Sequence, residues 1–93
     1  MSKLTDAEIT GFLEGLIGWS RQGDQIRKTY KLATFPAALA FVMHVGFLAE
    51  AAGHHPDIDI RYNKVTLGLT THDAGGLTAK DFDLAAAADE VMG

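Results

Sequence analysis

The spacing of apolar residues divides the chain into helical and extended segments. In three segments, 5–16, 34–52 and 78–91, apolar side chains recur every three or four residues, which is typical of a helix with one buried stripe. In the stretches between them apolar and polar residues alternate, as in strands that bury one face. The pattern predicts three helices separated by two pairs of strands.

Local signals at the segment ends support this division. Thr5 and Glu8 have the spacing of a capping box, in which each side chain accepts a hydrogen bond from the backbone N–H of the other residue. Thr34 is expected to cap the second helix, whose first turn tolerates Pro36. Gly53 is expected to end that helix, because glycine takes the left-handed conformation without a steric penalty.

Two turns complete the expected topology. Residues 23–24 are a Gly-Asp turn signal between two short extended runs, and residues 63–64 are expected to connect strands 58–62 and 65–70. The order is then α-β-β-α-β-β-α. We predict an α+β fold with two layers, in which a four-stranded antiparallel sheet carries the helices on one face. A chain of 93 residues is expected to form a single domain, residues 1–93.

Composition and charge narrow the class of protein. Apolar residues make up 47% and charged residues 22% of the chain, as in soluble globular proteins and unlike disordered ones. The net charge is −4, which argues against direct binding of nucleic acid or of an anionic membrane surface, because both need a concentrated positive face.

Other sequence features bear on redox chemistry and location. The absence of cysteine removes disulfides, thiolate nucleophiles and cysteine-ligated zinc. The stretch MSKLTDAEIT lacks the apolar run of a signal peptide, and the most apolar segment, LAFVMHVGFLA, is too short to span a bilayer. We therefore expect a cytoplasmic protein.

Three of the four histidines lie within nineteen residues. If the loop between the last two strands has two residues, counting outward places His55 opposite His72 on the polar face of the hairpin. His54 points the other way, because neighbouring strand residues face opposite sides. Pro56 has no N–H to donate to a ladder, so we expect the two segments to lie close together whether or not the pairing reaches the histidines.

Such a cluster suits acid–base chemistry. A free imidazole has a pKa of about 6.5, and two imidazoles within a few ångströms resist being charged together, so an acid and a base coexist. The chain has no cysteine and no serine in a nucleophile-elbow motif, which favours proton transfer, such as hydration or dehydration, over covalent catalysis. A metal site is not expected, because His54 and His55 diverge and a third ligand is missing. The alternative is that these three histidines lie on the surface and have no role. No role is assigned to His44, the fourth histidine.

The segments GHHPDI, YNKV, TTHDAGGLT and KDFDLA, in this order and spacing, resemble the pterin-4a-carbinolamine dehydratase family, also known as the dimerisation cofactor of a homeodomain transcription factor. The resemblance is strongest from Glu50 to Ala85 and extends upstream through Gly18 and Trp19. It implies the same α-β-β-α-β-β-α fold. It also implies loss of water from 4a-hydroxytetrahydropterin to give quinonoid dihydropterin, which regenerates the pterin used by aromatic amino acid hydroxylases.

The resemblance implies roles for individual residues as well. His54 and His72 match the family's acid–base groups at the 4a-hydroxyl, and His55 matches its substrate-binding histidine, so these three form the expected catalytic set. The residues expected to contact the substrate are His54, His55, Pro56, Thr71, His72, Asp73, Ala74, Trp19 and Asp81. The resemblance implies no metal and no other cofactor.

Three residues have a structural alternative. Trp19 is equally well explained as a core aromatic residue on an early strand. Glu50 either orients a histidine or is an ordinary carboxylate on a helix surface. Asp81 either contacts a histidine or acts only at the start of the third helix, where it has capping-box spacing from Thr78.

Two functions remain open from the sequence. The first is the dehydratase, and the second is a catalytically silent member of the same fold that acts through protein–protein contacts. The intact His-His-Pro and Thr-His set favours the enzyme, because an inactive relative need not keep it. The resemblance implies a homodimer or homotetramer and a functional link to an aromatic amino acid hydroxylase. Two free sheet edges and alanine-rich apolar helices also favour oligomerisation.

Overall fold

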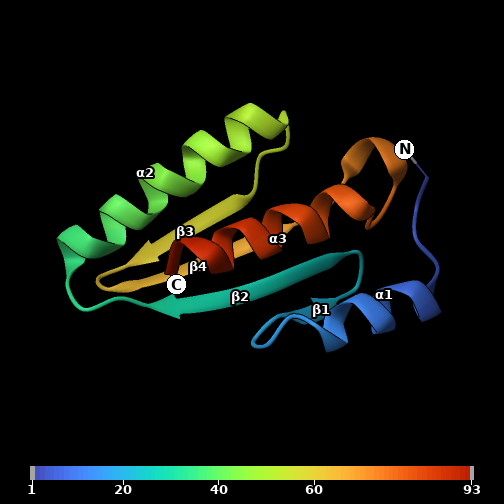
Figure 1. The fold of residues 1–93 in the computed structure, drawn as a ribbon, viewed down its shortest axis with the longest axis horizontal. Coiled ribbons are helices and arrows are strands. Elements are labelled where there is room, and N and C mark those ends of the chain that lie inside the picture. Colours follow the sequence, from blue (N-terminus) through green and yellow to red (C-terminus); the bar gives the residue numbers. More distant parts are fainter. Residues whose placement is uncertain (1, 93) are drawn as a thin grey trace.

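The computed structural model describes residues 2–92 and has the predicted element order. The strands form one antiparallel sheet in the order β1-β2-β4-β3, with α2 and α3 side by side on one face and α1 near β1 (Figure 1). The α+β prediction is confirmed. The elements are α1 (Asp6–Glu14), β1 (Ser20–Gln22), β2 (Gln25–Lys31), α2 (Phe35–Ala52), β3 (Asp57–Arg61), β4 (Lys64–Leu69), the 3₁₀ turn η1 (His72–Ala74) and α3 (Ala79–Met92).

The helix ends follow the local sequence signals. At α1 the Thr5 hydroxyl accepts from the Glu8 N–H at 3.2 Å and the Glu8 carboxylate accepts from the Thr5 N–H at 2.9 Å, so the capping box is confirmed. At α2 the Thr34 hydroxyl accepts from a backbone N–H of the first turn. Gly53 ends α2 in the left-handed conformation, with φ of 63°. The first helix ends at Glu14, two residues earlier than expected.

The hydrophobic core lies between the sheet and the two long helices. Burial of one large aliphatic side chain contributes about 1.5–3 kcal/mol, so a continuous core of this kind fixes both helices on the sheet. The first helix joins the core from the side, because Phe12 stacks on Phe82 of α3 with ring centroids 5.1 Å apart. The core residues on the central strands and the two long helices are Ile26, Tyr30, Val65, Leu67, Leu69, Ala38, Phe41, Val45, Ala49, Phe82, Leu84, Ala85 and Ala88.

A polar cluster around Asp89 ties α3 to the strands. The Asp89 carboxylate accepts hydrogen bonds from the Trp19 indole at 3.2 Å, from the Lys28 ammonium at 2.9 Å and from the Tyr30 hydroxyl. Burial, together with the hydrogen bond to the Asp89 carboxylate and its charge, raises the pKa of Tyr30. Trp19 is only 6% exposed, so the core alternative describes its surroundings.

The connection between β3 and β4 differs from the predicted one. The turn consists of Tyr62 and Asn63, and Arg61 pairs with Lys64. The prediction was wrong by a register shift of two residues, because Tyr62 takes a φ of 54° that its residue type gives no reason to expect. A shift of two keeps every side chain on the predicted face, so the core assignment was unaffected.

The apolar helix α2 extends on both sides of the apolar segment LAFVMHVGFLA, as the predicted helix over 34–52 requires. Its 18 residues have a mean hydropathy of 1.6 and reach the length and composition of a membrane span, a test that core helices of soluble proteins also pass. In the structure the helix covers the sheet with one stripe and exposes another. The exposed stripe is formed by Phe35, Leu39, Met43 and Phe47, spaced four residues apart.

Candidate active site

His54 enters the site from the turn that ends α2. The left-handed Gly53 reverses the chain, and the His54 N–H then donates to the Ala49 carbonyl at 3.1 Å. The His54 side chain is buried, whereas the side chain of His55 is 67% exposed. The two neighbouring imidazoles therefore point in different directions, as predicted.

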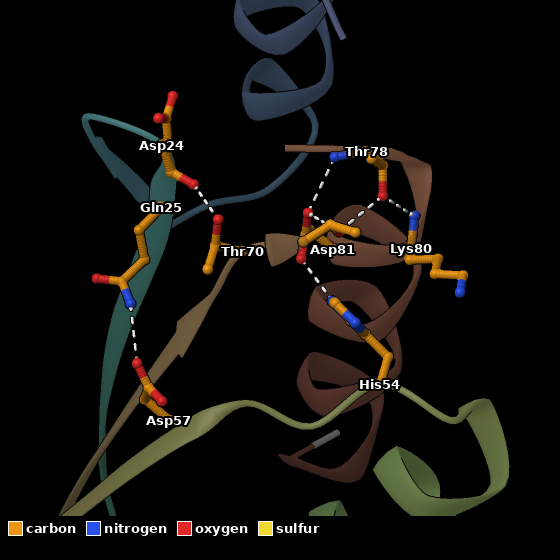
Figure 2. A network of polar contacts seen from close by, with 9 residues as sticks. Asp24, Gln25, His54, Asp57, Thr70, Thr78, Lys80 and Asp81 are labelled. Carbon is orange, nitrogen blue, oxygen red and sulfur yellow. Dashed lines mark hydrogen bonds and ion pairs between the residues drawn. The ribbon is translucent and has the colours of Figure 1, made fainter. Parts of the chain in front are cut away.

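A buried carboxylate holds the His54 ring. The Nε2 atom of His54 lies 2.6 Å from Oδ1 of Asp81, whose side chain is fully buried in the first turn of α3. The other carboxylate oxygen, Oδ2, accepts from the Thr71 hydroxyl at 2.8 Å and from the Thr78 N–H at 2.9 Å. Figure 2 shows His54 and the Thr78 backbone on opposite sides of the Asp81 carboxylate. Of the two alternatives for Asp81, the structure supports contact with a histidine, and the same carboxylate also caps the helix.

This arrangement fixes the tautomer of the histidine. An ionised carboxylate only accepts hydrogen bonds, so Nε2 of His54 carries a hydrogen and Nδ1 remains available to give or take a proton. No buried side-chain nitrogen or oxygen among residues 2–92 lacks a hydrogen-bond partner, so Nδ1 keeps contact with accessible space. His54 is thus oriented from behind by Asp81 and exposed at one nitrogen.

His72 is carried by a short closed loop that follows β4. Thr71 and Gly76 exchange backbone hydrogen bonds of 3.2 and 3.3 Å, and between them Gly75, with φ of 75°, donates to the His72 carbonyl at 3.0 Å. The preceding residue, Thr70, donates its hydroxyl to the Asp24 carbonyl in the β1–β2 turn (Figure 2). These contacts hold the loop, while the His72 side chain itself is exposed.

The third histidine has an acidic partner of its own. Nε2 of His55 lies 2.7 Å from a carboxylate oxygen of Glu50, which belongs to the last turn of α2. Both side chains are exposed, at 67% and 80%. Of the two alternatives for Glu50, the structure supports the one in which it orients a histidine.

The three imidazoles meet at one cleft of about 280 Å³. The β3–β4 ladder ends at the pair Asp57 and Gly68, so the conditional pairing of His55 with His72 does not form, whereas the expected proximity of the two segments is confirmed. The histidines meet because the loop after α2 and the loop after β4 both end beside the start of α3. The residues that line the cleft are Gly53, His54, His55, Thr70, Thr71, His72, Asp73 and Lys80.

The expected substrate contacts divide into three groups. Five of them line the cleft, and Asp81 lies beneath His54. The other three are outside the lining: Pro56 and Ala74 belong to the two loops that carry the histidines, and Trp19 lies in the Asp89 cluster. The expected contacts did not include Gly53, Thr70 and Lys80, although each directly precedes a residue that they did include.

The cleft gathers side chains that can give or take protons. Three histidines line it together with Asp73 and Lys80. Within residues 2–92, no group of three or more histidine, aspartate or glutamate side chains is placed to hold a metal ion. The fold and the site thus define a small α+β protein with a histidine-lined cleft.

Comparison with known proteins identifies the family. Residues 2–91 match the family model described as Pterin 4 alpha carbinolamine dehydratase. Proteins named "Putative pterin-4-alpha-carbinolamine dehydratase" are 68% identical over 91 residues in Roseiflexus sp. (strain RS-1), covering 98% of each chain, and 66% identical over 93 residues in Chloroflexus aurantiacus (strain ATCC 29366 / DSM 635 / J-10-fl), covering all of both. The chain belongs to this family of hydro-lyases, and the predicted resemblance is confirmed.

Solved structures agree with this assignment. The crystal structure of a transcriptional coactivator/pterin dehydratase from Brucella melitensis superposes with a TM-score of 0.95 at 30% identity, covering 99% of this chain and 100% of that one. A pterin dehydratase-like RuBisCO assembly factor of the alpha-carboxysome has a TM-score of 0.70 at 24% identity over 82% of this chain and 90% of its own, and shares the fold alone.

Proposed function

We propose that this chain removes water from 4a-hydroxytetrahydropterin to give quinonoid dihydropterin by histidine acid–base catalysis. The observation that carries the proposal is the cleft itself, where imidazoles from two separate loops meet and one of them is held by a buried carboxylate. Family membership supplies the reaction class. The chain is proposed to act in the cytoplasm, in recycling of the pterin used by an aromatic amino acid hydroxylase.

The proposed reaction needs one acid and one base. A protonated imidazole donates to the 4a-hydroxyl as the C4a–O bond breaks, and a neutral imidazole accepts the proton that leaves N5 as the C4a–N5 double bond forms. One water is released and no oxidant is needed. His54 and His72 are the proposed pair, because they come from different loops on one cleft. Positioned acid–base groups of this kind contribute about 10²- to 10⁴-fold in rate.

The surrounding residues are proposed to bind and orient. His55, Thr71 and Asp73 line the cleft and are placed for direct contact with the pterin. Asp81 is a positioning residue, because it reaches the substrate only through His54. No contact with the pterin is proposed for Trp19, whose indole N–H is directed at Asp89.

A turnover assay with freshly generated 4a-hydroxytetrahydropterin tests this function. The wild-type chain is expected to accelerate dehydration over the uncatalysed rate, and the His54→Ala, His72→Ala double variant is expected to lose that acceleration. His44→Ala is the matched control, because His44 is exposed on α2 and outside the cleft. Undiminished turnover by the double variant would rule out the proposed chemistry.

A homo-oligomer is the proposed assembly state. The stripe of Phe35, Leu39, Met43 and Phe47 leaves four large apolar side chains 44–69% exposed on one helix, and such contiguous patches mark interaction sites. The strands β1 and β3 are edges of the sheet as well. A second copy of the chain that covers the stripe would form a symmetric interface.

The second candidate function is a binding module without catalysis. The observation in its favour is the shared fold of the pterin dehydratase-like RuBisCO assembly factor. The histidine set of this chain converges on one cleft, which a pure assembly module does not require. Failure to bind any reduced pterin, together with a stable complex with another protein in pull-down, would reverse this order.

A further inference from the structure

A second hollow adjoins the histidine cleft between α2 and α3. Its volume is about 280 Å³, and Lys80 borders both spaces. Either hollow alone falls just below the range of about 300–1,000 Å³ typical of small-molecule sites, whereas the two together lie within it. The groove, named here the α2–α3 groove, is lined by Leu48, Ala52, Lys80, Asp83, Leu84 and Ala87.

The chemistry of the proposed substrate determines where a ring substituent begins. In a pterin, C6 is separated from the reacting C4a by N5 alone. A substituent on C6 therefore starts beside the histidines that act at C4a, and it must leave through the rim of the cleft. A pterin that fills only the cleft leaves this arm without contacts unless a neighbouring space receives it.

Two neighbouring hollows share residues with the cleft and differ in character. The first, reached past Thr70 and His72, is the polar hollow, lined by polar side chains, among them Asp24 and Gln25, and by two glycines, without an aliphatic side chain. The second is the α2–α3 groove, whose floor consists of aliphatic side chains. An arm with an apolar or aromatic body gains more free energy in the second, because burial of apolar surface contributes about 25 cal/mol per Å².

The charged residues at the rim do not decide between the two hollows. Asp24 lines the first hollow and Asp83 lines the α2–α3 groove, so each contains a carboxylate. Within residues 2–92, Lys80 takes part in no ion pair, so it is available to a polar group of the arm where the cleft and the groove meet. The aliphatic floor of the groove therefore decides the choice, and it matches an arm with an aromatic body.

We propose that the α2–α3 groove is a specificity subsite that receives the 6-substituent of the pterin and favours an apolar or aromatic arm. This inference rests on the proposed function, since it takes the pterin ring to lie in the histidine cleft. The substrate class is then reduced pterins with extended 6-arms.

Calorimetric titration of the full chain with two stable ligands tests the subsite. The ligands are 7,8-dihydro-6-methylpterin, which has a minimal arm, and 7,8-dihydrofolate, which has an aromatic arm with carboxylates. We expect the long-armed ligand to bind about tenfold more tightly, since partial burial of one aromatic ring contributes on the order of 1–2 kcal/mol. Ala87→Leu fills the groove and is expected to bring the ratio of the two affinities close to one. Ala86→Leu is the matched control, because Ala86 is exposed next to the groove and outside its lining.

Each result supports or overturns the subsite. A ratio near one in the wild-type chain overturns it and leaves the proposed function intact, because the ring still binds. Equal loss of the ratio in Ala87→Leu and Ala86→Leu also overturns it. A ratio that survives Ala87→Leu assigns the arm to the polar hollow instead. If neither ligand binds, the proposed function fails and this inference fails with it.

Discussion

The imidazole of His54 and the carboxylate of Asp81 form a buried pair, with Nε2 and Oδ1 only 2.6 Å apart. Asp81 uses its other oxygen to hold Thr71 and the backbone of Thr78. One carboxylate therefore orients a histidine of the cleft, fixes the loop that carries His72, and starts α3. The stability of the fold and the geometry of the site depend on the same side chain.

Replacement of this carboxylate by an amide is expected to affect stability and turnover together. In Asp81→Asn, an NH₂ group replaces one of the two carboxylate oxygens. Where the NH₂ group faces the Thr78 N–H, this buried donor loses its acceptor. Where it faces His54, the histidine has to change tautomer. We expect the free energy of unfolding to fall by about 1–3 kcal/mol and kcat to fall by about 10²-fold. Urea unfolding and the turnover assay measure the two effects. Glu90→Gln, an exposed change on the same helix, is the control, and equal behaviour of the two variants would contradict the assigned role.

Loss of the exposed pair of Glu50 and His55 is expected to lower turnover without lowering stability. In Glu50→Ala the imidazole loses the group that orients it, so kcat is expected to fall severalfold. The free energy of unfolding is expected to stay within about 0.5 kcal/mol, because exposed ion pairs contribute little. Glu14→Ala removes an equally exposed carboxylate from α1 and should leave both quantities unchanged. An unaltered kcat in Glu50→Ala would show that the contact is incidental.

The Asp89 cluster predicts an alkaline limit to stability. Burial and the neighbouring Asp89 raise the pKa of Tyr30. Above pH 10, near the ordinary tyrosine value, the unfolded chain loses this proton and the folded chain keeps it, so the contribution to stability that is full below pH 10 declines as the pH rises. Urea unfolding across this pH range should show a steeper decline for the wild-type chain than for Tyr30→Phe.

A spectroscopic titration isolates the same phenol. The chain has two tyrosines, so Tyr62→Phe leaves Tyr30 as the only one. Its ultraviolet absorbance should show no phenolate as the pH passes 10 and a sudden appearance when the protein unfolds. A smooth titration centred near pH 10 in the folded protein would contradict the buried cluster.

The exposed stripe on α2 predicts a change of assembly state on mutation. Met43→Glu with Phe47→Glu places two charges where the side chains are now 63% and 69% exposed. We expect sedimentation equilibrium to show an oligomer for the wild-type chain and a 10.0 kDa monomer for the double variant. Ala86→Glu, on the exposed side of α3, is the control. A wild-type monomer would refute the proposed assembly.

Much of the fold was predictable because its signals are local. The capping box of Thr5 and Glu8, the helix stop at Gly53 and the buried aliphatic face of β4 each depend on residues close in sequence, and each is confirmed. The β3–β4 turn was not predictable in this way. The side-chain amide of Asn63 donates to the Leu32 carbonyl, and the backbone carbonyl of Asn63 accepts from the Leu32 N–H. The turn that Tyr62 begins is therefore accompanied by contacts with a distant segment of the chain.

The sequence predicted which residues form the site better than it predicted how they are arranged. Convergence of the two histidine segments follows from the hairpin that lies between them, and a wrong register still placed them at one end of the sheet. The pair of His54 and Asp81 spans 27 residues and depends on how α3 packs, which no local pattern encodes. The role of Lys80 at the junction of two hollows likewise appears only in three dimensions.

The most direct test of the central claim uses the four histidines as probes. Imidazole signals of isotopically labelled protein can be followed by NMR during titration with 7,8-dihydro-6-methylpterin and assigned by single substitutions. We predict that the signals of His54, His55 and His72 shift together along one saturation curve while that of His44 stays fixed. A ligand that binds and leaves the first three signals unmoved, or that shifts His44 instead, would contradict the placement of the pterin among these imidazoles.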